Sequence, residues 1–443
     1  MGPARALDFP LTVPDADLPS HAMERALVET RAKRNEEEEK PREALRRATR
    51  SASSGRFVHD DDRFPNAKDM GFWDFVRWKR SVVATPRPTD SDLLSLSPVA
   101  IDFEKLASPP TSGAPQCTWL GHATVLVQMG GWTVLTDPLM TNRRCSPIPL
   151  LGPQRLVEPP IGPRELTDSV KIDVVLISHN HYDHLDVATV TALAKQRPSP
   201  PLWLVPLGLK PWMADLGIRN VVELDWSEQV TMAKAGRPPA TFTCLPAQHF
   251  SSRGPLDRNA TLWASWLCST APVEAPASKG HKFYFAGDSG SSPIYERIGQ
   301  VHGPIGKSIT TSPSLPLSPP PLSLPLSLSL SLGCAMLTHP RAPRVFLSLF
   351  LACLPIDLCA LPIGAYGHPS ERWFMEPVHM DCEEAVRAHR DLGSVKSIGI
   401  HWGTFQLTAE PILDPPRQLK RALKAANVRP SDFVVLRPGE TDR

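Results

Sequence analysis

Three histidines and one aspartate are concentrated in the six residues from His179 to His184, in the pattern H-x-H-x-D-H. Imidazole nitrogens are ligands for zinc and iron, and carboxylate oxygens bind hard divalent cations. His179 and His181 are separated by one residue, so in an extended backbone their side chains point the same way. Asp183 and His184 follow on a turn and are expected to face a neighbouring point. We therefore predict that this segment supplies ligands to two metals.

An apolar run precedes this segment, and the same arrangement recurs three times along the chain. Val174 to Ile177 is rich in β-branched residues and predicts a strand that ends at the histidine-rich turn. Three further apolar runs end at a single ligand-type side chain each, namely His249, Asp288 and His401. Strand ends converge in α/β proteins, so these residues can meet although they are far apart in the sequence.

We predict two neighbouring metal sites with one carboxylate between them. The first set is His179, His181 and His249, the second is Asp183, His184 and His401, and the bridge is Asp288. Two cations at such a spacing lower the pKa of a water and stabilise negative charge in a transition state. The predicted chemistry is hydrolysis of an ester, an amide or a phosphodiester, and the motif does not choose among these.

Two other polar residues are candidates for the surroundings of the metals. His122 lies between two predicted strands, and we interpret it as a buried histidine beside the site, with direct ligation as the alternative. Asp137 follows the predicted strand Trp132 to Thr136 and suits a carboxylate that fixes the tautomer of a ligating histidine.

Strands and helices alternate around these residues. Further strands are expected within Cys117 to Gln128 and at Leu202 to Pro206, with helices from Asp186 to about Gln196 and from Lys210 to Leu216. This alternation predicts an α/β layered fold.

Composition restricts the partners and the compartment. The net charge of +2 over 443 residues indicates no nucleic-acid partner. Eight cysteines without a CxxC pair are typical of a reducing, intracellular compartment. A secretory signal is not expected, because Met1 is not followed by an apolar run. Residues 1–55 carry a charge run and few aromatics, which predicts a disordered segment before a domain at 56–443.

An aromatic stretch opens that domain. Trp73 to Arg80 predicts a short amphipathic helix that either caps the core or lies against a lipid surface. We favour core packing.

Several blocks of the sequence resemble the metallo-β-lactamase superfamily, whose fold is a four-layer αβ/βα sandwich. The H-x-H-x-D-H segment is shared by the whole superfamily. The blocks Gly364-Ala365-Tyr366, Arg372-Trp373-Phe374-Met375 and His401-Trp402-Gly403-Thr404-Phe405 resemble one branch, the phospholipases D that hydrolyse N-acyl-phosphatidylethanolamine. The resemblance covers residues 56–305 and 357–440.

This resemblance implies a substrate, a cofactor and residue roles. The expected cofactor is two Zn²⁺, while iron or manganese also suit the ligands. Tyr182 and His379 are implied to contact the substrate near its phosphate, and Asp288, Asp183 and His379 are the implied catalytic residues. Asp381 suits the N-cap of a helix that starts beside His379. The products would be N-acylethanolamine and phosphatidic acid.

The implied partners follow from that substrate. We expect a membrane phospholipid, peripheral contact with a membrane, and a homodimer as an open option. Another hydrolase of the superfamily (a lactonase, thioesterase or nuclease) is the alternative function. A non-catalytic binding protein would have a broken ligand set, whereas every ligand position here is filled.

Residues 306–356 depart from the resemblance. They form a Ser-, Pro- and Leu-rich insertion between Ile305 and Asp357. One interpretation is a membrane-attaching insertion. We favour a translated intron, because Gly306-Lys307-Ser308 can be encoded by GGT-AAG-TCN, which contains a splice-donor consensus. Ile356-Asp357 can be encoded by ATA-GAC, in which an AG spans the two codons. Excision up to this AG would join the leading G to AC and restore one Asp codon directly after Ile305.

Overall fold

The computed structural model describes residues 26–27, 45–68, 70–84, 87–141, 143–146, 152–254, 256–271, 280–303 and 354–443. The predicted insertion at 306–356 therefore lies outside the described residues, except for its last three. Residues 45–55, which we placed in a disordered segment, include strand β2 and bury Leu45 in the core. The rest of that segment, apart from 26–27, is not described.

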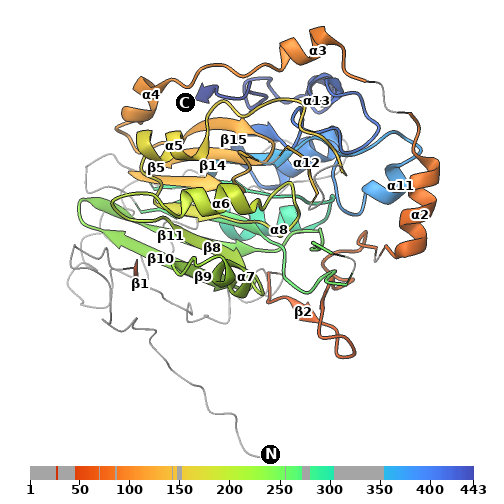
Figure 1. The fold of residues 1–443 in the computed structure, drawn as a ribbon, viewed down its shortest axis with the longest axis horizontal. Helices are drawn as coiled ribbons and strands as arrows, with labels where there is room; N and C mark the ends of the chain where they lie inside the picture. The colour runs from red at the N-terminus through yellow and green to blue at the C-terminus, as the bar shows by residue number, and fades with distance from the viewer. Residues whose placement is uncertain are drawn as a thin grey trace, which may run out of the picture.

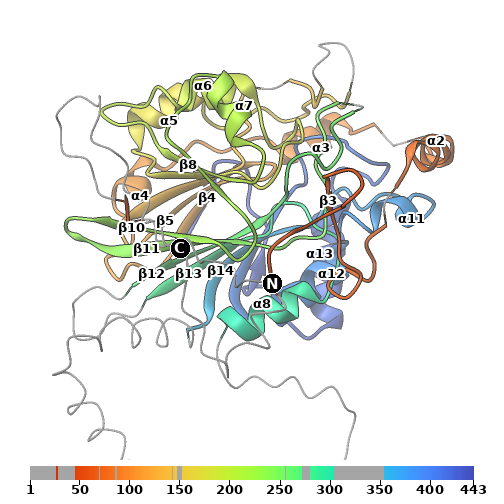
Figure 2. The same ribbon diagram turned by 90° about the horizontal axis from the view of Figure 1, so that it is seen from below.

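Two large sheets and two sets of helices form four layers (Figures 1 and 2). The first sheet has the order β1-β10-β11-β12-β13-β14-β15-β16, with β1 Ala26–Leu27, β10 Gln229–Lys234, β11 Arg237–Leu245, β12 Ser265–Thr270, β13 His281–Phe285, β14 Ile356–Pro362, β15 Ser394–Ile400 and β16 Phe433–Val434. The second has the order β17-β4-β5-β6-β7-β8-β9, with β17 Thr441–Asp442, β4 Gln116–Gly121, β5 Thr124–Met129, β6 Trp132–Thr136, β7 Val174–Leu176, β8 Leu202–Pro206 and β9 Val221–Leu224. A small hairpin pairs β2 Thr49–Arg50 with β3 Phe57–Val58.

Helices cover the outer face of each sheet (Figure 2). On the second sheet they are α5 Pro163–Ser169, α6 Val187–Leu193 and α7 Lys210–Asp215, and on the first they are α8 Ile294–His302, α12 Cys382–Asp391 and α13 Asp414–Ala425. The peripheral helices are α2 Phe72–Ser81, α3 Asp90–Ser95, α4 Phe103–Ala107 and α11 Arg372–Met375. Among the described helices, none has both the length and the apolar character needed to cross a membrane.

The apolar run of β7 shows why the second sheet lies in the middle of the layers. Side chains alternate between the faces of a strand. Val174 and Leu176 join the core between the sheets, whereas Val175 and Ile177 join a second core beneath the helices. Both faces are therefore buried, which explains a continuous run of apolar residues rather than an alternating pattern.

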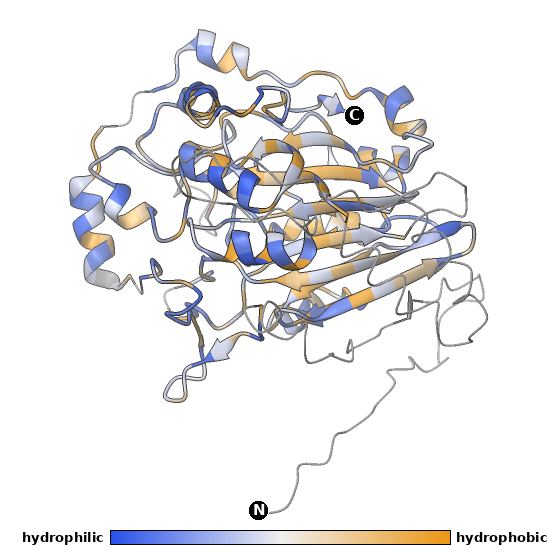
Figure 3. Cartoon of the chain, turned by 180° about the vertical axis from the view of Figure 1, so that it is seen from behind, coloured by the Kyte–Doolittle hydropathy of each residue, from blue (hydrophilic) through white to orange (hydrophobic). Residues whose placement is uncertain are grey.

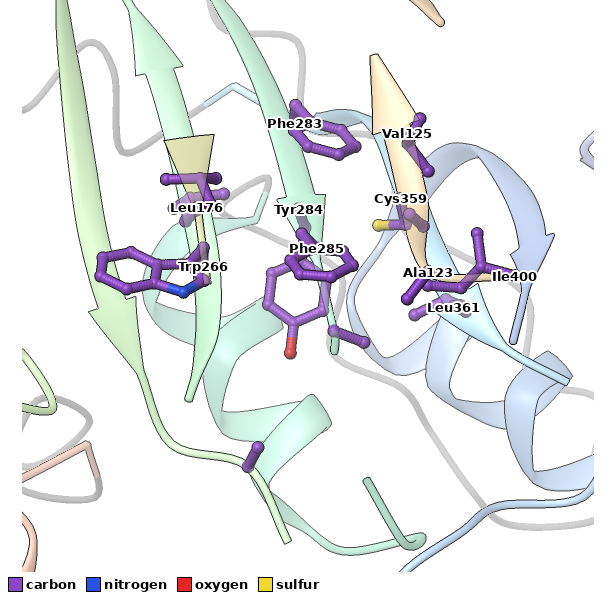
Figure 4. Packing of buried hydrophobic residues seen from close by; sticks show 14 of the residues in the cluster. Ala123, Val125, Leu176, Trp266, Phe283, Tyr284, Phe285, Cys359, Leu361 and Ile400 are labelled. Atoms are coloured by element: carbon purple, nitrogen blue, oxygen red, sulfur yellow. The ribbon is translucent and has the colours of Figure 1, made fainter. Parts of the chain in front are cut away.

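The core between the sheets is aromatic (Figure 4). Trp266, Phe283 and Phe285 of the first sheet face Val125 and Leu176 of the second. Figure 3 shows apolar strands enclosed by helices whose polar residues lie outside. The buried aromatics fix the spacing of the sheets and so the relative position of the loops at their edge.

The predicted elements are mostly confirmed. The strands within Cys117 to Gln128, at Trp132 to Thr136 and at Leu202 to Pro206 are present. Asp186 caps α6 by accepting a hydrogen bond from the backbone N of Thr189, but the helix ends at Leu193 rather than near Gln196.

Parallel strand pairs place the carboxyl ends of the central strands at one edge. In the second sheet β6, β7 and β8 are parallel, and in the first β13, β14 and β15 are parallel. Loops that follow such strands meet at the same side of the molecule. The predicted ligands all lie in or directly after loops at this edge.

Candidate metal centre

Four loops deliver the predicted ligands. The loop after β7 carries the histidine-rich turn, in which the carbonyl of His181 accepts hydrogen bonds from the backbone N of His184 (3.1 Å) and of Leu185 (2.9 Å). His249 follows β11, Asp288 follows β13, and His401 follows β15. One turn of helix-like backbone therefore places Asp183 and His184 at a neighbouring point, as predicted, with the centre of the His184 ring 4.2 Å from that of His179.

The first predicted set forms a compact group of imidazoles. Nε2 of His179 lies 2.8 Å from Nδ1 of His181, and Nε2 of His249 lies 3.2 Å from the same nitrogen. His179 and His249 are buried and His181 is half-buried, and the three rings point their nitrogens at one another. The structure brings this set together as the sequence predicts.

The second predicted set also converges, and His122 lies within it. Oδ2 of Asp183 is 3.5 Å from Nε2 of His401 and 3.7 Å from Nε2 of His184. Nε2 of His122 is 3.2 Å from the same oxygen. His122 therefore contacts the ligand set directly, and both of its predicted roles stay compatible with this position.

Asp288 lies between the two sets. Its Oδ2 is 3.0 Å from Nε2 of His184 and 3.1 Å from Nε2 of His401, and it is 3.8 and 3.9 Å from the corresponding atoms of His249 and His179. Burial by itself would raise the pKa of Asp288, but the imidazoles of His184 and His401 overcome this effect and hold the pKa well below its usual range. A carboxylate at this point can contact a cation in either set.

The arrangement fits two divalent cations. Tetrahedral zinc with Zn–N bonds of about 2.0–2.1 Å separates its nitrogens by about 3.3 Å, close to the spacing in the first set. Nε2 of His184 and of His401 are buried and lie close to Oδ2 of Asp288, but neither makes a hydrogen bond of normal geometry. Within the described residues, Oδ1 of Asp288 is also buried without a hydrogen-bond partner. Native proteins rarely leave such groups unpaired, so the residues present suit bound metal.

Asp137 orients one histidine of each set. Its Oδ2 accepts a hydrogen bond from Nδ1 of His184 at 2.6 Å. The same oxygen accepts one from the hydroxyl of Ser178, which in turn lies 2.8 Å from Nδ1 of His179. A carboxylate thus fixes the outer nitrogen of both rings and leaves Nε2 for a metal.

We expect the change Asp137→Asn to weaken metal binding. The amide nitrogen would face the donors Ser178 and His184, so the tautomers of the ligating rings would no longer be fixed. Loss of such a partner typically costs about 10- to 100-fold in metal affinity. Competition with a zinc-binding dye measures this, and Asp173→Asn, a buried carboxylate paired with Arg237, is the control. Equal affinity in the two variants would contradict the assignment.

Backbone strain is concentrated in this centre. His122, Asp137 and His401 have φ angles of 50°, 30° and 61°, in the left-handed region that non-glycine residues seldom occupy. Gly287, with φ of 60°, has no room for a side chain, since a Cβ there would lie 2.5 Å from Cβ of Ser178. The strand ends are thus bent sharply to bring their ligands inward.

His379 lies against both ligand sets. Its ring centroid is 5.3 Å from that of His249 and 5.2 Å from that of His401, and burial lowers its pKa to about 3. Its carbonyl accepts a hydrogen bond from Arg372 at 2.8 Å. Asp381 caps α12 as predicted, in a capping box with Glu384.

Comparison with known proteins decides the family. A profile for the beta-lactamase superfamily domain matches residues 133–309. An uncharacterized protein of Mycobacterium tuberculosis is 35% identical over 328 residues, which cover 73% of this chain and 67% of that protein. The N-acyl-phosphatidylethanolamine-hydrolyzing phospholipase D 1 of Caenorhabditis elegans is 34% identical over 331 residues, which cover 73% and 74% of the two chains. The chain belongs to this phospholipase D family of the beta-lactamase superfamily.

Family membership confirms the predicted fold and the coarse chemistry. The mitochondrial N-acyl-phosphatidylethanolamine-hydrolyzing phospholipase D of Saccharomyces cerevisiae is 29% identical over 305 residues, covering 68% of this chain and 50% of that protein. An isothiocyanate hydrolase from Delia radicum gut bacteria is a similar solved structure, with a TM-score of 0.45, 16% identity, and coverage of 74% and 98%. The chain is a metal-dependent hydrolase with the metallo-β-lactamase sandwich.

One contact beside the metal centre was not predicted from the sequence. Arg253, four residues after His249, reaches back to the histidine-rich turn. The sequence gives no signal for this, because the arginine lies in a loop of Ser, Gly and Pro and its partners are backbone carbonyls about 70 positions away.

Proposed function

We propose that this chain is a dinuclear zinc phosphodiesterase that hydrolyses N-acyl-phosphatidylethanolamine to N-acylethanolamine and phosphatidic acid. The observation that carries the proposal is the position of Oδ2 of Asp288, within 3.9 Å of a histidine nitrogen of each ligand set. The names of the Caenorhabditis elegans and Saccharomyces cerevisiae relatives support the substrate.

The protein's own residues would bind and orient the phosphodiester. Bound cations would supply a water of lowered pKa and would neutralise charge on the phosphoryl oxygens. Asp288 would accept a hydrogen bond from the attacking water and hold it between the two ligand sets. His379 would face the phosphate from the side of His249 and His401, and Arg372 would keep the backbone of His379 in place. Tyr182 would contact the headgroup from the histidine-rich turn.

The test is hydrolysis of N-acyl-phosphatidylethanolamine in mixed micelles made with ¹⁸O-labelled water. Attack at phosphorus places the label in phosphatidic acid, whereas cleavage of an acyl ester places it in a fatty acid. We expect labelled phosphatidic acid and equimolar unlabelled N-acylethanolamine from the zinc-loaded chain. If a folded, zinc-loaded chain leaves this lipid intact and cleaves lactones or thioesters instead, the proposed substrate is wrong.

Peripheral membrane contact, which we include in the proposal, is supported by helix α2. Trp78 docks this helix, because its Nε1 donates to Oε1 of Glu371 at 3.1 Å and its ring stacks on Phe374. Trp73 and Phe75 are 78% and 45% exposed. Core packing, the interpretation we favoured, thus applies to Trp78, while the other two aromatics face outward.

Basic residues surround these exposed aromatics. Arg77, Lys79 and Arg80 are exposed, and the Arg77 guanidinium lies 4.7 Å from the centre of the Trp373 ring on α11. Exposed Trp and Phe beside basic residues suit the interface of an anionic bilayer. Figure 1 places α2 and α11 beside each other, and α11 leads directly to His379.

We expect the double substitution Trp73→Ala and Phe75→Ala to weaken binding to vesicles that contain anionic phospholipid by roughly 10- to 30-fold, because it removes apolar surface that the bilayer would bury. Hydrolysis of a water-soluble short-chain analogue should be unchanged. Vesicle flotation measures the binding. Val395→Ala, which removes an exposed apolar side chain at the start of β15, is the control. Equal binding by both variants would show that α2 does not contact the bilayer.

A further inference from the structure

Arg253 joins the two ends of the turn that carries Asp183 and His184 of the second ligand set. Its Nη1 donates hydrogen bonds to the carbonyl of Asn180 and to the carbonyl of Leu185, both at 2.8 Å. His181, Asp183 and His184 all lie between these two carbonyls in the sequence. One guanidinium nitrogen therefore spans the whole turn.

The same guanidinium lies on the ring of Tyr182. The distance from Cζ of Arg253 to the ring centre is 4.0 Å, and the ring of Trp212 is 5.2 Å away. A cation over an aromatic face restricts the orientation of the ring. Tyr182 is the residue of the turn that the proposed function assigns to the substrate.

The backbone of Arg253 is itself fixed. Its N donates to both carboxylate oxygens of Asp257 at 3.0 Å, and the N of Gly254 donates to Oδ1 at 2.7 Å. His249 stands four residues earlier in this loop, and its Nδ1 donates to the carbonyl of Val378 at 3.0 Å. The guanidinium therefore connects two loops that are each held at another point.

We propose that Arg253 is a positioning residue of the metal centre. It fixes the turn that carries Asp183 and His184 relative to the loop that carries His249, and it sets the Tyr182 ring toward the substrate. The second part rests on the proposed function, whereas the first concerns metal retention alone.

The chemistry of the contact requires arginine. A planar guanidinium can donate to carbonyls in its plane while its face stacks on an aromatic ring. A lysine ammonium keeps the charge but is a strongly hydrated point without a flat face. A methionine side chain keeps much of the length of arginine but donates no hydrogen bond and carries no charge. The series Arg253, Arg253→Lys and Arg253→Met therefore removes the contacts in steps.

The first measurement is the rate at which zinc-loaded protein loses metal to excess EDTA. Loss of a partner that orients ligands typically costs about 10- to 100-fold in metal affinity, so we expect Arg253→Met to lose zinc at least about 10-fold faster, with Arg253→Lys between it and the parent chain. Arg237→Met is the matched control. Arg237 begins β11, a strand about 26 Å long whose far end leads to His249. The Arg237 guanidinium is paired with Asp173 and lies 5.8 Å from the centre of the Trp132 ring.

The second measurement separates KM from kcat at saturating zinc. If Arg253 positions Tyr182, Arg253→Met and Tyr182→Ala should each raise KM for N-acyl-phosphatidylethanolamine, and the double variant should be no worse than the poorer single variant. Circular dichroism and thermal unfolding establish that each variant is folded. If Arg253→Met does not fold, the lysine variant supplies both readouts.

The outcomes are distinct. If Arg253→Met loses zinc at the same rate as Arg237→Met, Arg253 does not fix the turn that carries Asp183 and His184. Additive effects of Arg253→Met and Tyr182→Ala on KM overturn the positioning of the ring. If the parent chain does not hydrolyse the lipid, the proposed function fails, and the rates of zinc loss still decide whether Arg253 holds the ligand turn.

Discussion

Replacement of Asp288 by asparagine is expected to reduce kcat by a factor on the order of 10³ or more. Loss of one aligned electrostatic contact in an active site typically reduces kcat by about this factor. The side chain keeps its shape but loses its charge at a point that faces both ligand sets. Oδ2 of Asp288 lies 3.0 Å from Nε2 of His184 in the second set and 3.8 Å from Nε2 of His249 in the first. The zinc content should also fall below two per chain, because the asparagine gives one neutral oxygen where the carboxylate gives two charged ones.

The measurements are kcat on the phospholipid and zinc per chain by elemental analysis. Asp173→Asn is the matched control, since it also neutralises a buried carboxylate, but one bound to Arg237 at the opposite end of the sheets. We expect this control to retain both zinc and activity. A folded Asp288→Asn variant with two zinc ions and activity within about 10-fold of the parent chain would refute the bridging role.

Deletion of residues 306–356 is expected to stabilise the fold by about 3 kcal/mol, the loop-closure free energy between connections of about fifty and two residues. The described ends support so short a connection. Nζ of Lys282 donates to the carbonyl of His302, at the end of α8, and to that of Leu354, just before β14. These two ends therefore lie side by side, and αβ connections of two to six residues are typical.

The deletion also preserves the start of β14. Ile356 is fully buried and is paired with Ser394, and the shortened chain places Ile305 at the same position directly before Asp357. Chemical denaturation of the two chains measures the difference in the free energy of unfolding. In the shortened chain Ile305→Ala should cost about 2–5 kcal/mol, as for a buried isoleucine.

Two results would contradict this account of the insertion. A shortened chain that is less stable than the full one would show that residues 306–356 belong to the fold. Mature transcripts that all encode the segment would exclude the retained-intron hypothesis, whatever the stability.

Metal-dependent hydrolysis and most of the local structure could be predicted from residue types and their spacing. The H-x-H-x-D-H turn predicts metal ligands through residue type and spacing, which are local properties. Continuous apolar runs between polar turn residues predicted β7 and β8, because a strand that is buried on both faces is apolar throughout. Strand ends then indicated where His249, Asp288 and His401 belong.

The contacts between groups far apart in the sequence, by contrast, could be known only from the folded chain. The hydrogen bonds of Asp137 to His184, and through Ser178 to His179, depend on the left-handed backbone at Asp137, which no sequence spacing reveals. The fit of residues 45–55 against the domain depends on contacts such as that between Ala48 and Asp225.

Arg253 illustrates the same limit. Its partners are the backbone carbonyls of Asn180 and Leu185, and every residue offers a carbonyl, so no side-chain type marks the partner in the sequence. The packing of aromatic side chains between the two sheets brings these loops together. Contacts between a side chain and distant backbone carbonyls therefore depend on the whole fold, whereas the capacity to bind metal can be predicted from residue types and their spacing.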